Sequence, residues 1–405
     1  MRISQINAVY GYGSTGIIVR DLQSLCRQAG LDCEVVYSKS QGVVENGFQI
    51  GNAFSDKLHA LLTRISGKQG YFSWLPTMRL LRHYNECKPD IIHLHNLHGS
   101  YINLPMLLRY AAKNDIPVVV TLHDCWFYTG GCSHYTHSNC FRWKESCGNC
   151  PQRNWEFRSL IYDASSTKLN DRERLFGAIK KLTVVGVSQW IVDEASYKVF
   201  RNARRVTIHN GIDTDFFHPV DSEFRKKFNL DGKFVILAPA NKWFLDINCQ
   251  TFDYFARHLT DDMRMVFIGK NVDTSRLTDN MLNIGFVSSR EEIRAIYSAC
   301  DVMVNCSREE SLSLLNIEVQ SCGTPVVTYA NTGVRETVDN KCSFAVENGN
   351  PQAAWNAMMK IREKGKANLS ASCQQWARQE FDANKNYKKY IDLYRQITDN
   401  CPGSL

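Results

Sequence analysis

The sequence predicts an α/β protein with two domains, each built around a doubly wound parallel sheet. Short apolar runs alternate along the chain with stretches of helical periodicity, which is typical of parallel strands joined by helical crossovers. Runs such as Pro117–Leu122 are apolar throughout, as expected of strands buried on both faces. The alternation begins again in the second half of the chain, and we place the domain boundary between about residues 205 and 220.

The strands and helices can be assigned in order from these patterns. In the first half, strands are predicted at residues 2–9, 33–37, 90–95, 117–122, 182–187 and 206–209, with a helix ending near residue 29 and two helical stretches within 54–88. In the second half, strands are predicted at 234–239, 263–268, 281–285, 302–304 and 326–329. Helices are predicted there at 249–258, 291–299, 312–322, 351–364, 369–379 and 384–397.

The overall composition is typical of a soluble globular protein. The 405 residues are 44% hydrophobic and 22% charged, and no window is apolar enough to span a membrane. The first residues form a strand and do not resemble a signal peptide, so we expect a cytoplasmic protein. A net charge of +7 suits an anionic substrate or an acidic membrane surface and is a weak signal for nucleic acid. Fifteen cysteines then indicate free thiols or a metal site.

A glycine-rich turn follows the first predicted strand. Gly11, Gly13 and Gly16 form a G-x-G-x-x-G pattern between a strand and a helix, the arrangement of a dinucleotide-binding turn. Such a site also needs an acidic residue at the end of the second strand to hold a ribose. That strand runs instead into Ser38 and Lys39, and the missing acid argues against an NAD(P) site.

The strongest functional pattern lies in the second half of the chain. Glu310 stands in the loop after an apolar strand, and Glu318 lies about two turns into the helix predicted at 312–322. Ser311 or Ser313 can cap this helix. A helix N-terminus offers free N–H groups and a partial positive charge, which suits a phosphate. The alternative is an amphipathic helix whose acids only favour its dipole.

Glu310-x7-Glu318, followed by residues 323–327 (GTPVV) and 332–333 (TG), resembles the retaining GT-B glycosyltransferases of family 4. In that family the first Glu lies beside the donor sugar, the amides after it hold the sugar and diphosphate, and the second Glu binds the ribose. The resemblance therefore implies that Glu310 is catalytic and that Glu318 binds the donor. The other donor-binding candidates, from the glycine turn, the loop after Glu310 and the strand ends near the base, are Gly13, Ser14, Ser311, Leu312, Ser313, Gly269, Lys270, Phe286 and Val287.

The same resemblance covers nearly the whole chain and implies the GT-B fold, two Rossmann-like domains that face a cleft. We expect an acceptor-side domain at residues 1–208 and a nucleotide-sugar donor domain at 209–383. The family's linker into the second domain resembles residues 210–213 (NGID). A C-terminal helix at about 384–405 is expected to cross back to the first domain, as is usual in GT-B enzymes.

His123 stands at the carboxyl end of an apolar strand, where open α/β sheets bind their ligands. The run TLHD resembles the family position whose histidine contacts the donor sugar, which makes His123 a catalytic candidate. A histidine at a strand end is otherwise often a core residue. The candidates for the acceptor side are His93, His95, His98 and Asp124.

One departure from the family concerns the cations that hold the donor phosphates. The family has an Arg and a Lys-Gly after the first strand of the second domain. Lys242 stands in for the Arg and is a catalytic candidate, whereas the Lys position falls on Asp246 or Ile247. One phosphate cation is therefore expected to be missing, and we expect a slow or weakly binding enzyme.

A cysteine-rich stretch follows His123 and resembles a subset of family 4 concerned with colanic acid and related surface polysaccharides. Four of its thiols end in a C-x-x-C pair and could hold a tetrahedral zinc ion; they are Cys132, Cys140, Cys147 and Cys150. Such a metal would be structural, because four thiolates leave no open position for substrate. The alternative is a loop of reduced cysteines.

The two helical stretches within residues 54–88 carry scattered bases with aromatic and apolar residues between them. They form either solvated amphipathic helices or a surface that faces an anionic membrane or an acceptor.

The functional prediction is a metal-independent, retaining hexosyltransferase that needs no cofactor for catalysis. It would move a sugar from a UDP- or GDP-sugar to a growing, lipid-linked surface polysaccharide, such as an O-antigen or capsule. The hydroxyl would attack from the leaving-group face, as the family implies. Two alternatives remain: a non-catalytic GT-B protein that binds glycan or a partner, which would explain the missing lysine, and an NAD(P)-dependent oxidoreductase.

Overall fold

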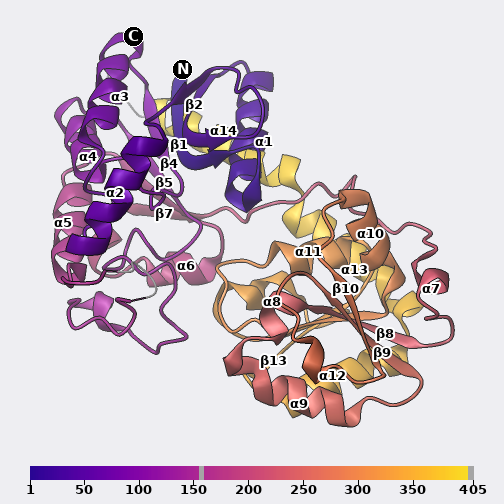
Figure 1. The fold of residues 1–405 in the computed structure, drawn as a ribbon. Helices are drawn as coiled ribbons and strands as arrows, with labels where there is room; N and C mark the ends of the chain where they lie inside the picture. The colour runs from indigo at the N-terminus through magenta and orange to yellow at the C-terminus, as the bar shows by residue number, and fades with distance from the viewer. Residues whose placement is uncertain (155–158, 400–405) are drawn as a thin grey trace. The chain divides into compact units, whose positions relative to one another are not determined.

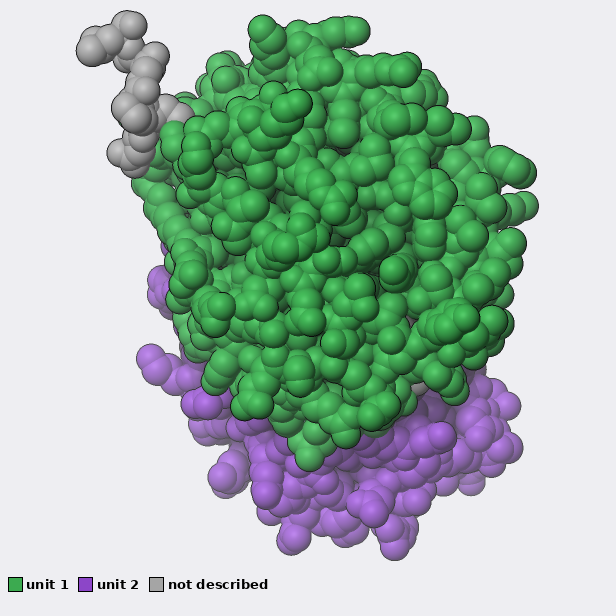
Figure 2. Space-filling model, turned by 90° about the vertical axis from the view of Figure 1, so that its left-hand side faces the viewer, with its two compact units in different colours: residues 1–208, 387–405 green, residues 209–386 purple. Residues whose placement is uncertain are grey.

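A computed structural model describes residues 1–154 and 159–399. The chain forms two compact units (Figures 1 and 2). Unit 1 comprises residues 1–208 and the C-terminal stretch that begins at Tyr387, and unit 2 comprises residues 209–386. Each unit contains one parallel sheet with its own hydrophobic core.

Unit 1 is built on a seven-stranded sheet in the order β3-β2-β1-β4-β5-β6-β7, in which all neighbours are parallel. The strands are β1 (Arg2–Tyr10), β2 (Asp32–Ser40), β3 (Gly47–Gln49), β4 (Ile91–Leu94), β5 (Val118–Leu122), β6 (Leu182–Gly186) and β7 (Arg204–Thr207). All of β5 is buried, as its uninterrupted apolar sequence predicts. Ile6 of β1 lies between Val36 and Leu94, which sets the register of the central strands.

The helices of unit 1 connect these strands. They are α1 (Gly13–Gln28), α2 (Ala53–Ser66), α3 (Trp74–Cys87), α4 (Leu104–Lys113), α5 (Ser165–Gly177) and α6 (Gln189–Glu194), with 3₁₀ turns η1 (Arg142–Lys144) and η2 (Lys198–Phe200). Local sequence signals fix several of their starts. The Asn52 side chain accepts from the backbone of Phe54 and Ser55 at the start of α2, and Asn103 caps α4.

The C-terminal helix α14 (Ala383–Asp399) belongs to unit 1 from Tyr387 onward, as the resemblance implies. Its contact with the sheet is partly polar. The Tyr394 hydroxyl lies 2.6 Å from Nδ1 of His93, and the Tyr390 hydroxyl lies 3.1 Å from Oγ1 of Thr121. All four residues are buried, so these hydrogen bonds fix where the helix lies on the core.

Unit 2 repeats the plan with a six-stranded parallel sheet in the order β10-β9-β8-β11-β12-β13. Its strands are β8 (Phe234–Pro239), β9 (Met263–Ile268), β10 (Met281–Gly285), β11 (Val302–Asn305), β12 (Val326–Tyr329) and β13 (Phe344–Val346). Its helices are α7 (Phe224–Lys227), α8 (Ala240–Trp243), α9 (Cys249–His258), α10 (Arg290–Ala299), α11 (Leu314–Ser321), α12 (Pro351–Lys364) and α13 (Lys366–Phe381), with 3₁₀ turns η3 (Asp246–Asn248), η4 (Thr274–Arg276) and η5 (Thr332–Thr337).

The strand order determines where each unit can bind a ligand. In both sheets the first strand lies in the interior, the next two extend to one edge, and the fourth returns to the other side of the first. The connections therefore diverge between β1 and β4 in unit 1, and between β8 and β11 in unit 2. Ligands of open α/β sheets bind at the carboxyl ends of strands at such a point.

No helix in residues 1–154 or 159–399 is long and apolar enough to cross a membrane.

Candidate functional site

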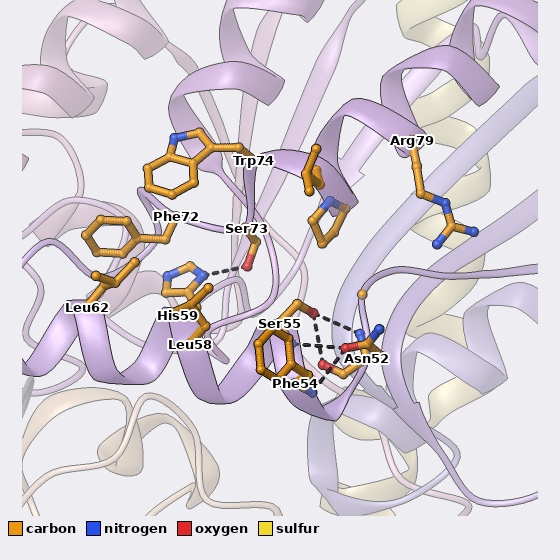
Figure 3. A pocket seen from close by; sticks show the side chains of 13 residues that line it. Asn52, Phe54, Ser55, Leu58, His59, Leu62, Phe72, Ser73, Trp74 and Arg79 are labelled. Atoms are coloured by element: carbon orange, nitrogen blue, oxygen red, sulfur yellow. Dashed lines mark hydrogen bonds between the residues drawn. The ribbon is translucent and has the colours of Figure 1, made fainter.

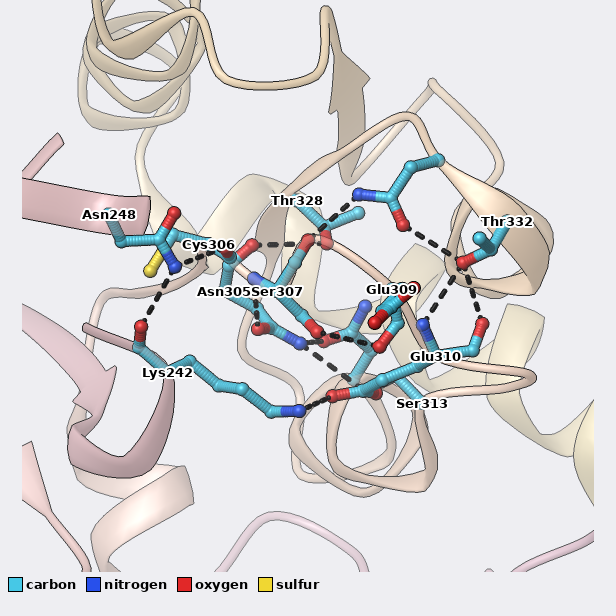
Figure 4. Close-up of polar contacts among 12 residues, drawn as sticks. Lys242, Asn248, Asn305, Cys306, Ser307, Glu309, Glu310, Ser313, Thr328 and Thr332 are labelled. Carbon is cyan, nitrogen blue, oxygen red and sulfur yellow. Dashed lines mark hydrogen bonds and ion pairs between the residues drawn. The ribbon is translucent and has the colours of Figure 1, made fainter. Parts of the chain in front are cut away.

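The charged centre of unit 2 is an ion pair at the divergence point of its sheet. Lys242 lies in α8, just after β8, and Glu310 lies in the loop after β11, so the two residues follow neighbouring strands. Lys242 Nζ lies 2.5 Å from Glu310 Oε1, and both side chains are largely shielded, with 24% and 20% of their surface exposed (Figure 4). The pair thus occupies the position where the sheet topology favours a ligand.

Thr332 fixes the backbone of Glu310. The Glu310 N–H donates to Oγ1 of Thr332 at 3.1 Å, and that hydroxyl lies 2.7 Å from the Glu310 carbonyl oxygen (Figure 4). The Gly333 N–H donates to the same carbonyl at 3.2 Å. Both backbone polar groups of Glu310 are thus held, and its carboxylate pairs with Lys242.

The helix after Glu310 begins later than expected, and neither predicted serine caps it through its side chain. α11 starts at Leu314 with Ser313 at the N-cap, but Oγ of Ser313 lies 3.3 Å from Nδ2 of Asn305 and makes no cap hydrogen bond. Oγ of Ser311 is buried without a hydrogen-bond partner among the described residues. The capping prediction was wrong because Asn305, at the end of β11, engages Ser313 and Asn316 first. Leu312 and Ser313 still precede the first turn, whose amides lack intrahelical acceptors.

Glu318 lies on α11 beside two residues of α10. The Tyr297 hydroxyl donates to Oε2 of Glu318 at 3.4 Å. Burial raises the pKa of Glu318 to about 7, although the charge of Arg290 and the hydrogen bond from Tyr297 act in the opposite direction. The carboxyl is therefore poised to ionise near neutral pH when a partner offers hydrogen bonds.

The candidates near the nucleotide base separate into exposed and buried residues. Gly269 follows β9 with a φ of +120° and donates its N–H to Gly285 O at 2.8 Å. The Lys270 ammonium lies 4.5 Å from the centre of the exposed Phe286 ring. Val287, in contrast, is buried in the core of unit 2, so its side chain is not available to a ligand.

In unit 1, the glycine turn closes tightly at the end of β1. Gly11 and Gly13 have φ values of +77° and +64°, and the Gly11 N–H donates to Gly16 O at 3.0 Å. A Cβ at Gly16 would lie 3.1 Å from Cγ2 of Val9, so helix and strand can approach this closely only at glycine. Ser14 is exposed in the first turn of α1, which contains no acid.

A row of buried histidines ends at His123. Nε2 of His123 lies 3.0 Å from Nδ1 of His95, and Nε2 of His95 lies 3.1 Å from Oε1 of Gln5. The Gln5 amide nitrogen donates to Sγ of Cys33, so its oxygen faces His95 as an acceptor. His95 must then carry its proton on Nε2, and His123 must donate from its own Nε2. This leaves Nδ1 of His123 as an acceptor, buried and without a partner among the described residues.

Burial also keeps this pair neutral. It lowers the pKa of His123 to about 4 and holds that of His95 well below its ordinary value. His95 is fully buried with both ring nitrogens engaged, so the prediction that it contacts an acceptor was wrong: the sheet encloses it, and it orients His123. Similarly, both nitrogens of His93 are occupied within the core.

His98 and Asp124 are the remaining acceptor-side candidates, and the structure brings them together. Nε2 of His98 lies 3.0 Å from Oδ2 of Asp124, and the other carboxylate oxygen accepts the Trp126 N–H at 2.8 Å. Burial opposes ionisation of Asp124, but His98 and the Trp126 N–H outweigh it and lower the pKa of the carboxyl. Asp124 is thus an anion held beside His123 in sequence and in space.

Comparison with known proteins identifies this arrangement. The family described as "Glycosyltransferase Family 4" matches residues 16–216, and "Glycosyl transferases group 1" matches residues 247–380. The chain belongs to the family 4 GT-B glycosyltransferases. Members of this family retain the anomeric configuration and work without a metal.

Individual relatives are distant, and some of them match nearly the whole chain. A glycosyl transferase of Escherichia coli K12 named for colanic acid biosynthesis, WcaC, is 22% identical over 98% of this chain and 100% of its own. The N,N′-diacetylbacillosaminyl-diphospho-undecaprenol α-1,3-N-acetylgalactosaminyltransferase of Campylobacter jejuni is 26% identical over 47% of this chain and 54% of its own. The structure of Anabaena HepE in complex with UDP-glucose aligns with a TM-score of 0.63 at 15% identity, over 98% of this chain and 100% of that one.

The family has a lysine at a position where this chain lacks one, and the structure places another cation, Arg308, near that position. Nε of Arg308 donates to Oδ1 of Asn248 at 2.7 Å, and its Nη2 donates to the carbonyl of Ile247 at 3.0 Å. Arg308 precedes Glu310 by two residues and contacts the turn η3, in which the sequence lacks a lysine. Sequence reasoning missed it because sixty residues separate the two stretches.

The four predicted zinc ligands gather around one small cavity of about 20 Å³. The described cysteines form no disulfides. Over residues 1–154 and 159–399, however, the one group of at least three potential ligands within 4.8 Å of each other is Glu34, His83 and Cys87, in which His83 and Glu34 already form a 2.5 Å ion pair. A closed thiolate cage is therefore not assembled.

The role of His95 in this glycosyltransferase can be tested by substitution. His95→Phe removes the acceptor for His123 Nε2–H and should lower turnover about tenfold, the value of one hydrogen bond. His95→Asn, whose side-chain oxygen can replace Nδ1, should retain most activity. ¹⁵N NMR should show His123 protonated on Nε2 in the parent and in His95→Asn, with mixed tautomers in His95→Phe. Equal tautomer populations in all three proteins would contradict the assigned role.

Proposed function

We propose that this glycosyltransferase moves a sugar from a UDP- or GDP-sugar to a lipid-linked saccharide of a surface polysaccharide. The observation that carries the proposal is the Lys242–Glu310 pair, which stands between β8 and β11 with Glu318 on the following helix. The UDP-glucose bound by HepE and the undecaprenol-linked substrate in the name of the Campylobacter relative support the two substrate classes.

Donor binding would act through an exchange of partners. A diphosphate carries more negative charge than one carboxylate, so Lys242 would leave Glu310 and pair with a phosphate oxygen. Glu310 would then be free to accept hydrogen bonds from the sugar hydroxyls. As the glycosidic bond breaks, negative charge grows on the leaving diphosphate, and a cation already in place stabilises it. The hydroxyl that attacks from the same face gives its proton to the phosphate, and no covalent intermediate on a carboxylate is needed.

Arg308 would supply the second positive charge that the sequence comparison finds missing. Asn248 and the Ile247 carbonyl hold two of its nitrogens, and a Cβ at Gly349 would lie 1.8 Å from the third, so the guanidinium is closely confined. A guanidinium held in this way binds phosphate without a large loss of side-chain entropy. We therefore expect an enzyme with both cations, in place of the weak one predicted from the missing lysine.

The other donor-binding roles in the proposal follow the geometry of each residue. Glu318 would accept the ribose hydroxyls, and the exposed ring of Phe286 with Lys270 and Gly269 would lie by the base. His123 would accept a hydroxyl of the donor sugar through Nδ1. Gly13 and Ser14 of the glycine turn would face phosphate or acceptor. Catalysis would require no cofactor.

If Lys242 exchanges partners on donor binding, substitutions of Glu310 and of Lys242 should affect diphosphate affinity differently. Glu310→Gln should abolish most transfer but bind nucleoside diphosphate as tightly as the parent or more tightly, because Lys242 is released. Lys242→Met and Arg308→Gln should each weaken diphosphate binding about ten- to a hundredfold, the value of a charge-assisted hydrogen bond. Titration calorimetry with UDP and GDP measures these affinities.

Glu309→Gln is the matched control for this series, since it removes a neighbouring carboxylate outside the pair. It should leave both transfer and binding near the parent values. If the parent binds nucleotide-sugars but neither transfers nor hydrolyses them, the chain is a non-catalytic member of the family. If Lys242→Met and Arg308→Gln bind UDP and GDP like the parent, the diphosphate is held elsewhere.

The ionisation of Glu318 gives a pH dependence. Ribose hydroxyls donate to the carboxylate, so binding should favour the ionised form of a group whose pKa is about 7 in the free protein. Between pH 6 and pH 8, nucleotide affinity should rise about tenfold, because the ionised fraction rises by that factor. In Glu318→Gln this component should vanish, which separates it from titration of the nucleotide phosphates. A pH profile unchanged by the substitution would remove Glu318 from the ribose site.

The proposed acceptor is attached to a lipid, and unit 1 has a surface suited to an anionic membrane. On α2, the exposed apolar side chains recur at helical spacing along one outer face: Phe54, Leu58, Leu61 and Ile65. Trp74, Leu75 and Met78 of α3 and Leu160–Tyr162 extend the exposed apolar surface, and Leu160 is tied to α2 through the carbonyl of Arg64. Exposed bases lie in or directly after the same two helices: Lys57, Arg64, Lys68, Arg79, Arg82 and Lys88.

A cavity of about 270 Å³ opens between the same two helices (Figure 3). His59 at its base is neutral, because burial lowers its pKa to about 4 and its ring nitrogens bond to Ser73 and to the Gly70 N–H. An apolar cavity with a neutral floor suits a lipid chain more than an anion. We propose that α2 and α3 attach the enzyme peripherally to the inner face of the cytoplasmic membrane.

The membrane contact can be tested with vesicles. Phe54→Ser combined with Leu58→Ser should weaken binding to vesicles that contain anionic lipid by at least about tenfold, through loss of buried apolar area. Binding of the parent should fall as salt is raised. Val43→Ser, which alters another exposed apolar residue of unit 1, is the control. Equal binding of the double variant and the control would exclude this surface.

A further inference from the structure

The segment between β5 and α5 contains four cysteines that surround one cavity. This four-cysteine cluster consists of Cys132, Cys140, Cys147 and Cys150. We propose that the four-cysteine cluster holds one structural zinc ion and that Lys168 and Arg172, two buried cations of α5, balance its charge.

The size of the cavity and the chemistry of its walls fit a single ion. The cavity measures about 20 Å³, enough for one atom the size of a water molecule. The backbone around the cluster is held in place, since the Cys150 N–H donates to Oδ2 of Asp163 at 2.8 Å. Cys147 packs closely on the chain at Gly130, where an added Cβ would lie 2.8 Å from its sulfur. Such outer contacts hold the ligands of metal sites in orientation.

The two cations are an independent observation. Lys168 and Arg172 lie four residues apart on α5, so they share one face of the helix, and both are fully buried. Two like charges enclosed side by side are unfavourable unless negative charge lies close to them. Lys168 interacts electrostatically with Cys132 and Cys150, and Arg172 interacts with Cys147 and Cys132.

The hydrogen bonds of Arg172 involve only one of its three guanidinium nitrogens among the described residues. Its Nη1 donates to the carbonyls of Trp126 and Thr129 at 2.5 and 2.6 Å, and the guanidinium lies 4.0 Å from the Trp126 ring centre. Its Nε and Nη2 are buried and have no hydrogen-bond partner within the described part of the chain. Asp163 also acts on Lys168, but its oxygens accept the N–H groups of Cys150 and Ser165.

Zinc would complete this charge arrangement. Four thiolates and Zn²⁺ carry a net charge of −2, which the two cations of α5 neutralise, whereas four neutral thiols offer no negative charge to the unpartnered nitrogens of Arg172. In a tetrahedral thiolate site the sulfurs lie about 3.8 Å apart, and here no three of them lie within 4.8 Å of each other over the described residues. Binding must therefore draw the sulfurs of the cluster closer together.

The first experiment measures metal in the full chain. Protein purified without chelator should contain about one zinc per chain by elemental analysis, and reconstitution with Co²⁺ should give the visible bands of tetrahedral cobalt–thiolate coordination. Absence of both zinc and cobalt–thiolate bands, together with thiols that react equally fast with and without added zinc, would overturn the proposal. This readout uses the parent protein and does not depend on any variant folding.

The second experiment assigns the ligands and the balancing charge. Cys140→Ser and Cys150→Ser should lose most of the zinc, and Cys249→Ser, which removes a partly buried thiol of unit 2, should keep it. Arg172→Met should release zinc to a chelator at about tenfold lower chelator concentration than the parent, and Arg172→Lys should lie between them. Zinc content unchanged in both cysteine variants, or chelator resistance unchanged in folded Arg172→Met, would contradict the assignment.

Discussion

The structure depends on one topological constraint: in each unit the chain starts at an interior strand and later crosses to that strand's other side. Parallel strands need long crossovers, and the reversal of strand order leaves a crevice between two diverging connections. Residues that follow the diverging strands can meet there, because both segments leave the same edge of the sheet. Lys242 and Glu310 illustrate this, since they meet at 2.5 Å from the helix and the loop that follow adjacent strands.

In unit 2, the shielded charged groups need a partner or must stay neutral when no ligand is bound. A shielded ammonium or carboxylate without a partner is costly, so Lys242 and Glu310 compensate each other. Glu318 avoids the same cost by staying protonated below its raised pKa of about 7. Its raised pKa means that it costs nothing below about pH 4.5 and destabilises the folded unit as the pH rises toward 7. A ligand that satisfies these groups removes both constraints at once.

Much of the fold could be read from the sequence because its signals are local. Uninterrupted apolar runs identified β5 and β8 through their burial on both faces, and Asn-Pro at 350–351 marks a helix start that the structure confirms. The positions of Glu310 and Glu318 relative to a helix were equally local. The start of that helix could not be predicted from local signals. α11 begins two residues later than predicted because Asn305 engages Ser313, a contact that the capping preference of serine does not indicate.

The interactions that remained hidden join residues distant in sequence. Thr332 fixes the Glu310 backbone, Arg308 reaches the turn of Ile247, and Gln5 sets the protonation of His95, ninety residues away. The hydrophobic periodicity of a sequence does not indicate contacts between such distant residues. The family pattern indicated Thr332-Gly333 as a motif but not the contacts it makes, which hold both backbone polar groups of Glu310.

The two units consequently offer different chemistry to a ligand. Unit 2 presents ionised groups that can exchange partners, as suits a diphosphate. At His123, unit 1 presents a neutral acceptor, because burial lowers the histidine pKa and the chain from Gln5 through His95 fixes the proton on Nε2. A neutral acceptor of this kind binds a hydrogen-bond donor and has no charge with which to hold a phosphate. In the proposed function, His123 would therefore recognise a sugar hydroxyl, and the cations of unit 2 would hold the diphosphate.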